Sequence, residues 1–296
     1  MAPDRQERDC VMTPEVVVDL DLRIGENPLW HPGEECVLWE DIDPGRIFRY
    51  DPDTDAHEVL FAGGVIGGFT IQEDGSLLLF MEDGHVRKLK DGTLSVVVDG
   101  IDEERGTRFN DVIADPEGRV FCGTMPGKDG SARLYRLDRD GSISKMQDGI
   151  GLSNGMGFTP DMKSMYHTDS PNRTIYRYDY MRETGELGNR RVFAEIPPEE
   201  GVPDGMTVDS EACVWSARWD GGCVVRYSPG GEELLRITLP VKKVSSVTFG
   251  GKDYSSLYVT TAGGENRPEE GEAAGALFRV ETGFLGVPEF TSRVVL

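Results

Sequence analysis

The sequence predicts an all-β fold, a single six-bladed β-propeller spanning residues 1–296, with a metal site at its centre. One phrase recurs six times, successive copies start 42, 42, 44, 50 and 42 residues apart, and no stretch has a convincing helical period. A repeat of about 40–45 residues is typical of four-stranded propeller blades. The six copies begin at Glu26, Gly68, Asn110, Asn154, Asp204 and about Ser246.

Each copy opens with a short apolar run, turns at Pro, Asp or Gly, and continues into further strand-like runs. Pro116-Glu117-Gly118 and Pro160-Asp161 are such turns, and they separate alternating segments in the manner of β-hairpins. A third run follows in which apolar residues alternate with Arg or Asp, as in ARLYRL at 132–137. A lone sheet cannot bury both faces, so we expect the blades to stack around an axis.

Closure of the ring is expected to join the two ends of the chain. The extended segment PEVVVDL, Pro14 to Leu20, is expected to add an outer strand to the last blade beside the C-terminal strands. Residues 1–13 are expected to form a flexible N-terminal extension.

Composition excludes several classes of partner. The formal net charge of −22 opposes binding to nucleic acid and to anionic membrane surfaces. No apolar run approaches the ~20 residues of a membrane span, and the charged N-terminus does not match a signal peptide. We therefore expect a cytoplasmic protein, either a monomer or a homodimer, that binds a small molecule and neither nucleic acid nor membrane.

Four of the six copies begin with an oxygen donor at one register. Each donor lies six positions before the Pro or Ser of the following turn, so propeller symmetry predicts that the donors converge on the channel. Buried carboxylates without a partner cost several kcal/mol, which a divalent cation offsets. An oxygen-only set favours Ca²⁺ over Mg²⁺, Mn²⁺ or Zn²⁺. The alternative is that these side chains only cap turns. The proposed ligands are Glu26, Asn110, Asn154 and Asp204.

An ordered set of phrases gives the chain a family resemblance. They are GENPLW (25–30), RFNDVIADPEGRVFCGTM (108–125), LSNGMGFTPD (152–161), VPDGMTVD (202–209) and FGGKDYSSLYVT (249–260). Over most of its length the sequence resembles the SMP-30/gluconolactonase family. The resemblance implies a six-bladed lactone hydrolase with one divalent metal. On matching positions it implies Glu26, Asn154 and Asp204 as ligands, Asn110 at the metal or substrate, and Arg108 at the substrate.

Two positions depart from the pattern of the animal members of that family. Val112 stands where they have Gly after the Asn-Asp pair. After Gly-Thr-Met, where they have a substrate-facing acid, this chain reads Pro126, Gly127, Lys128. Lys128 is therefore a candidate substrate-binding residue, and recognition of sugar hydroxyls by a carboxylate at this point is in question.

The predicted activity is metal-dependent hydrolysis of a lactone derived from a sugar. The cation would polarise the lactone carbonyl and activate water, Asp204 would act as general base, and Arg108 would hold a polar group of the substrate. A related organophosphate or ester hydrolase is the alternative enzyme. A non-catalytic metal-binding propeller is the alternative outside enzymes.

Two other motifs carry little weight. Residues 151–155 match the G-x-S-x-G elbow around Ser153, but that elbow requires a strand-to-helix turn, and a β repeat follows here. Asp51, Asp53 and Asp55 imitate the start of an EF-hand loop, but Ala62 occupies its twelfth position. We expect a hairpin turn there.

Overall fold

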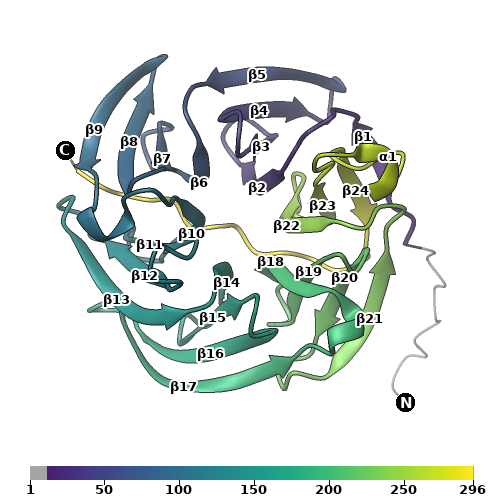
Figure 1. Cartoon of the computed structure of the whole chain (residues 1–296). Coiled ribbons are helices and arrows are strands. Elements are labelled where there is room, and N and C mark those ends of the chain that lie inside the picture. The colour runs from purple at the N-terminus through teal and green to yellow at the C-terminus, as the bar shows by residue number, and fades with distance from the viewer. Residues whose placement is uncertain (1–11, 296) are drawn as a thin grey trace.

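The computed structural model describes residues 12–295 and forms a ring of six four-stranded sheets around a central axis (Figure 1). The predicted six-bladed propeller is confirmed. Residues 1–11 of the predicted N-terminal extension lie outside the described residues. Met12 is described, and its side chain packs against a core cluster of the last two blades.

In the first five blades the strands follow one another in chain order. Blade 1 contains β2 (Gly25–His31), β3 (Cys36–Asp41), β4 (Arg46–Asp51) and β5 (Ala56–Ala62). Blade 2 contains β6 (Ile66–Ile71), β7 (Leu77–Met81), β8 (His85–Lys90) and β9 (Thr93–Asp99). Blade 3 follows the 3₁₀ turn η1 (Asp102–Glu104) and contains β10 (Phe109–Ala114), β11 (Val120–Thr124), β12 (Ala132–Leu137) and β13 (Ile143–Ile150).

The second half of the chain completes the ring. Blade 4 contains β14 (Ser153–Phe158), β15 (Ser164–Asp169), β16 (Thr174–Met181) and β17 (Glu186–Glu195). Blade 5 follows η2 (Pro198–Glu200) and contains β18 (Val202–Val208), β19 (Val214–Trp219), β20 (Cys223–Tyr227) and β21 (Glu233–Thr238). Blade 6 contains β22 (Val244–Gly250), β23 (Ser256–Thr261), β24 (Leu277–Glu281) and β1 (Glu15–Val18), and the short helix α1 (Arg267–Glu270) lies between β23 and β24.

Both ends of the chain contribute to blade 6, as the sequence predicts. Strand β1 pairs antiparallel with β24, with Glu15 opposite Arg279. An ion pair of 3.0 Å joins the Glu15 carboxylate to the Arg279 guanidinium. This pairing closes the ring, because β22 of the same blade contacts β2 of blade 1.

The hydrophobic core is distributed between the blades. Between blades 5 and 6, for example, the rings of Trp215 and Phe249 meet edge to face at 5.5 Å. Between blades 2 and 3, Phe80 and Phe109 meet in the same way at 5.4 Å. Each sheet therefore buries its faces against its neighbours.

The first strands of neighbouring blades contact one another around the axis and line the channel. In all six blades the register between the first and second strands shifts near the start of the first strand. An irregularity of this kind bends the strand and redirects a side chain. The six shifts coincide with the positions at which the sequence repeat begins.

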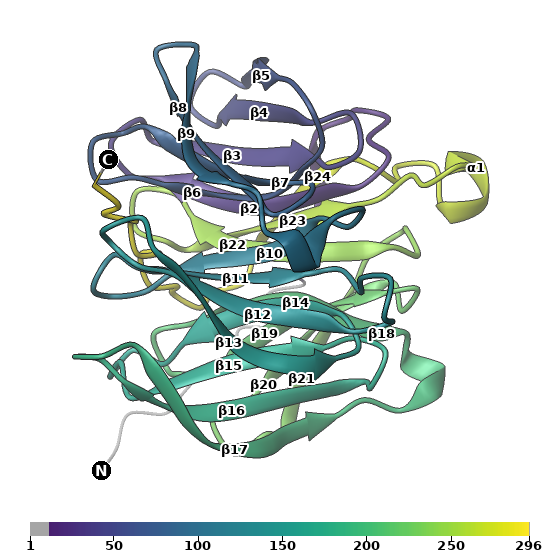
Figure 2. The ribbon, with the colours of Figure 1, turned by 60° about the vertical axis from the view of Figure 1, so that its left-hand side comes forward.

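The C-terminal segment, residues 283–295, crosses the channel mouth where the first strands end (Figure 1, yellow). Its backbone carbonyl groups accept hydrogen bonds from Ser210 and Glu73 of two different blades, at 2.8 and 2.9 Å. Helix α1 and the C-terminus lie on opposite sides of the ring in Figure 2. Because the first strands end at the mouth that the C-terminal segment crosses, their starts lie at the opposite mouth.

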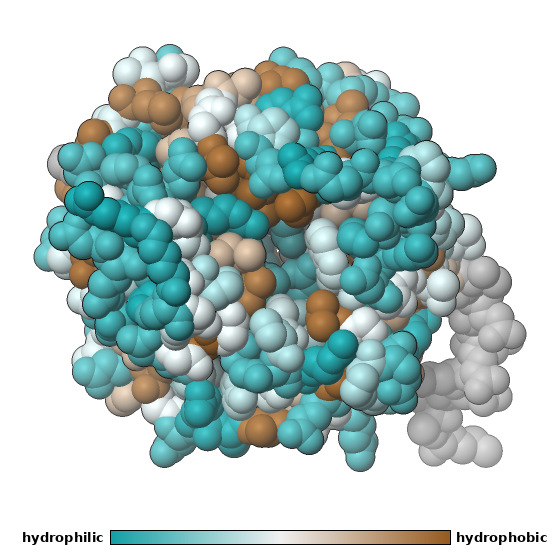
Figure 3. Space-filling view, in the orientation of Figure 1, coloured by the Kyte–Doolittle hydropathy of each residue, from teal (hydrophilic) through white to brown (hydrophobic). Residues whose placement is uncertain are grey.

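The face of the ring shown in Figure 3 is mostly hydrophilic, with hydrophobic residues in small separate groups. This distribution agrees with the formal charge of −22. No helix formed by residues 12–295 has the length and apolar character needed to cross a lipid bilayer.

Candidate metal and substrate site

The four predicted oxygen donors occupy equivalent positions at one mouth of the channel. Each is the second or third residue of a first strand, β2, β10, β14 or β18. Asn154 and Asp204 are buried, whereas Glu26 and Asn110 are half-buried. The four residues thus come from blades 1, 3, 4 and 5, as the repeat predicts.

The two amide side chains are fixed by neighbouring groups. The Asn110 Nδ2 group donates to the carbonyl oxygen of Ser153 at 3.0 Å, which ties blade 3 to blade 4. The Asn110 Oδ1 atom accepts a hydrogen bond of 2.7 Å from Nη1 of Arg108. Asn154 Oδ1 accepts from the backbone N–H of Gly155 at 3.1 Å. Both amides therefore hold defined orientations.

The two carboxyl groups of the set act on one another electrostatically. Burial raises the pKa of Glu26 well above its usual value, and the charge of Asp204 raises it further. Burial and the charge of Asp111 likewise raise the pKa of Asp204. A hydrogen bond from Asn154 and the charge of Arg108 oppose this shift and favour the ionised form of Asp204.

This donor set fits a hard divalent cation. Two carboxylates and two amides supply oxygen atoms alone, and a cation between the carboxylates relieves their repulsion. Within residues 12–295, no cluster of three or more His, Cys, Asp or Glu side chains is arranged to hold a metal ion. A site here therefore depends on Asn110 and Asn154.

Arg108 and Lys128 occupy the same side of the ring but differ in exposure. Arg108 is half-buried and feels the charges of Glu40, Asp43, Glu26 and Asp204. Lys128 is exposed in the loop between β11 and β12, and its side chain lies over Gly106, just before Arg108 in the chain.

Blade 2 contributes no donor, and its glycines have a steric role. A Cβ atom on Gly67 would lie 1.8 Å from the carbonyl oxygen of Phe109. One on Gly68 would lie 3.0 Å from Oδ1 of Asn27 and 2.9 Å from a methyl group of Val112. The glycines let blades 1 and 3 approach each other across the start of β6. Val112, which departs from the family pattern, forms part of this contact.

Sequence reasoning missed three acids around the site. Glu40 lies opposite Glu26 in the β2–β3 register, is fully buried, and has no hydrogen-bond partner on either carboxylate oxygen. Burial raises the pKa of Asp111 to about 7, with a smaller contribution from the charge of Glu289. Burial also raises the pKa of Glu289 to about 7. The Asn-Asp pair at 110–111 was the available signal for Asp111, whereas Glu40 reads as part of a core strand.

The G-x-S-x-G motif forms a buried pair. Ser153 begins strand β14, and its hydroxyl lies 2.7 Å from Nε2 of His167. Both side chains are at most 1% exposed, and Nδ1 of His167 has no hydrogen-bond partner among the described residues. Burial lowers the pKa of His167 to about 4. The pair lacks a third member and access for a substrate, so it joins two strands of blade 4.

We predict that Glu40→Leu stabilises the metal-free protein by about 1–3 kcal/mol, because it removes a buried carboxylate that has no hydrogen-bond partner among the described residues. Arg108 keeps other acids nearby, so losing the charge of Glu40 leaves it compensated. Urea unfolding in EDTA measures the change, and Glu40→Gln, which stays polar, should gain less. A destabilised Glu40→Leu protein would contradict the prediction.

Comparison with known proteins places the chain in a family. Residues 24–263 match the SMP-30/Gluconolactonase/LRE-like region. The chain is 52% identical to a pentonolactonase from Haloferax volcanii over 96% of its own length and 100% of the relative. It is 36% identical to a 6-deoxy-6-sulfogluconolactonase from Pseudomonas putida, over 83% and 86% of the two chains. A solved calcium-binding protein, regucalcin from Agrobacterium tumefaciens, superposes with a TM-score of 0.89 at 25% identity, over 96% and 98%. The chain belongs to the SMP-30/gluconolactonase/LRE-like family.

Proposed function

We propose that this chain hydrolyses a sugar-derived lactone with the help of one divalent metal ion. The observation that carries the proposal is the convergence of two carboxylates and two amides at one channel mouth. Arg108 donates a hydrogen bond of 2.7 Å to one of these amides, that of Asn110. The similarity to a pentonolactonase and a sulfogluconolactonase supports the substrate class.

Glu26, Asn154 and Asp204 are the proposed metal ligands, and Asn110 contacts the metal or the substrate. Ca²⁺ is the proposed ion, because the ligands are all oxygen atoms and a structural neighbour is a calcium-binding protein. Mg²⁺, Mn²⁺ and Zn²⁺ are the alternatives. A cation in this position supplies Lewis acidity to the lactone carbonyl and to water.

The protein's own side chains supply the general base and the substrate contacts. Asp204 accepts the proton of the attacking water, a role for which it must be ionised. The Asn154 hydrogen bond and the charge of Arg108 favour that state. Arg108 donates hydrogen bonds to an oxygen of the substrate, and the ammonium group of Lys128 contacts the substrate at the rim.

Calcium binding predicts a thermal shift. At a Ca²⁺ concentration 100 times Kd, we expect the free energy of unfolding to rise by about 2.7 kcal/mol and Tm by several degrees. Glu26→Gln should abolish most of this shift, because it removes one of two ligand charges. Asp51→Asn, at the end of β4, is the matched control and should keep the full shift. An undiminished shift in Glu26→Gln would place the ion elsewhere.

Activity tests the catalytic role of Asp204. We expect turnover of gluconolactone or other aldonolactones in a pH-stat, its loss in EDTA, and its return with Ca²⁺, Mn²⁺ or Zn²⁺. Asp204→Asn should lower kcat by roughly 10²–10⁴-fold, while circular dichroism reports an intact fold. Full activity in this variant would exclude the proposed base.

The same assay separates the alternatives. Turnover of paraoxon without turnover of any lactone would favour the organophosphate hydrolase. No turnover of any substrate with any metal would favour a non-catalytic metal-binding propeller.

A further inference from the structure

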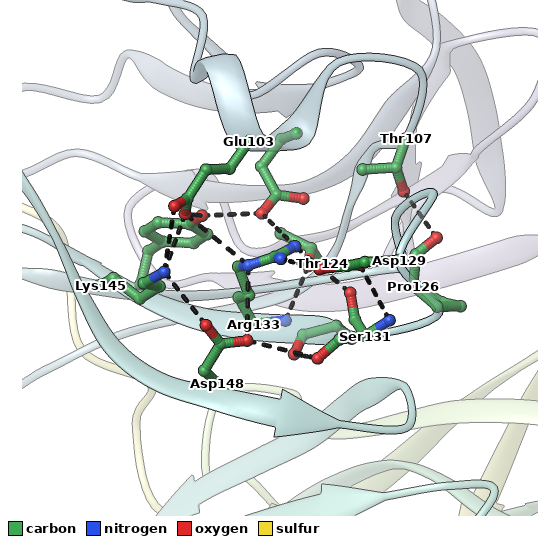
Figure 4. Close-up of polar contacts among 12 residues, drawn as sticks. Glu103, Thr107, Thr124, Pro126, Asp129, Ser131, Arg133, Lys145 and Asp148 are labelled. Carbon is green, nitrogen blue, oxygen red and sulfur yellow. Dashed lines mark hydrogen bonds and ion pairs between the residues drawn. The ribbon is translucent and has the colours of Figure 1, made fainter.

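Arg133, on blade 3, is a buried cation that meets acids from several segments (Figure 4). It is the second residue of β12, and its side chain is 7% exposed. Its guanidinium forms an ion pair with Asp129, and pairs of 3.4 Å with Glu104 and 3.5 Å with Asp148. A longer contact of 3.7 Å reaches Glu103. One side chain thus links two connecting segments to the end of β13.

The first of these segments leads to Arg108. Glu103 and Glu104 lie in η1, shortly before Arg108 in the connection from β9 to β10. Glu104 is fully buried, and its Oε1 atom accepts a hydrogen bond of 2.7 Å from the hydroxyl of Tyr135. Arg133 is the cation paired with this buried carboxylate.

The second segment carries Lys128. It is the loop from β11 to β12, and Asp129 within it pairs with Arg133. The backbone N–H of Arg133 donates to the Thr124 hydroxyl at 3.0 Å, at the end of β11. The base of the loop is therefore held by backbone and side chain together.

Hydrogen bonds also join the two segments to each other beside Arg108. The backbone N–H of Met125 donates to the carbonyl oxygen of Arg108 at 3.0 Å. The Thr107 hydroxyl donates to the carbonyl oxygens of Met125 and Pro126, at 3.3 and 3.4 Å. Displacement of one segment would therefore displace the other.

We propose that Arg133 is a positioning residue that sets substrate specificity by fixing the two segments bearing Arg108 and Lys128. The inference rests on the proposed function. The proposed metal ligands lie on first strands, and within residues 12–295 none of the ion pairs or hydrogen bonds of the Arg133 side chain reaches a first strand. Loss of Arg133 should therefore alter substrate binding more than the chemical step. Because Arg is buried among acids, its removal leaves like charges facing one another.

Steady-state kinetics with Arg133→Met test this proposal. We expect KM for the best aldonolactone to rise about tenfold or more, with kcat changed by less than about threefold. Arg133→Lys should recover part of the loss, because an ammonium group retains the charge without the planar fork. Dihydrocoumarin, which has no sugar hydroxyls, should show a smaller rise in KM.

Arg136→Met is the matched control. Arg136 lies on the same strand and forms an ion pair of 2.9 Å with Asp138 at the strand's other end. Its kinetics should equal those of the wild type. An unchanged KM in folded Arg133→Met, or an equal rise in Arg136→Met, would overturn the proposal. If Arg133→Met does not fold, Asp129→Asn tests the same loop contact, and an unchanged KM there would also overturn the proposal.

Hydrogen exchange separates this proposal from the proposed function. Amides at 102–107 and 125–131 should exchange at least tenfold faster in Arg133→Met than in the wild type or Arg136→Met. Unchanged exchange would overturn the positioning role even in an active enzyme. If exchange is faster in Arg133→Met but the wild-type protein hydrolyses no lactone, the positioning role stands and the lactonase activity is rejected.

Discussion

The radial equivalence of the six first strands is the constraint on which the rest of this structure depends. Once the ring closes through β1 and β24, residues at one register must share the space around the axis. Glu26 and Asp204 are thereby forced into a common electrostatic environment, and each has its pKa raised by burial. The fold brings together groups that would separate in water, and a bound cation would relieve the repulsion between them.

The mouth opposite these donors is covered by the chain itself. The backbone of residues 283–295 forms hydrogen bonds at the strand ends of several blades, and Glu289 accepts a hydrogen bond of 3.2 Å from Thr207 of β18. This segment supplies a second acid to the channel interior, beside Asp111. The two ends of the channel therefore differ, with the C-terminal segment at one end and the oxygen donors at the other.

The sequence predicted the architecture and the four donors because both follow from periodicity. A repeat fixes the number of blades, and a shared register fixes which residues converge. The remaining features have no periodic signal. Glu40 sits in the strand CVLWED, where the continuous apolar run before it indicates only a core strand. The register shift near each strand start, which redirects the donors, depends on pairing between strands and is invisible in one sequence.

For other residues the local sequence pattern did not reveal their partners in the fold. The G-x-S-x-G motif was correctly set aside, because Ser153 lies on a strand, but the bond between its hydroxyl and His167 required three-dimensional structure. Arg133 and Arg136 are three residues apart on β12, so their side chains point to opposite faces of the blade. Both are largely buried, at 7% and 14% exposure, but Arg133 meets several acids whereas Arg136 pairs with Asp138 just after the strand. The partners of each side chain, which the sequence alone does not show, separate their roles.

This distinction suggests how one scaffold can keep its chemistry while changing substrates. The donors are held by strands whose positions depend on the whole ring, so they resist local change. The backbone of Arg108 and the loop of Lys128 are held in part by ion pairs around Arg133, whereas the Arg108 guanidinium also donates to Asn110 on β10. Loops tolerate substitution better than paired strands. If Arg108, Lys128 and Arg133 have the proposed roles, a change of substrate would involve the segments around Arg133, whereas a change of reaction would involve the strand starts.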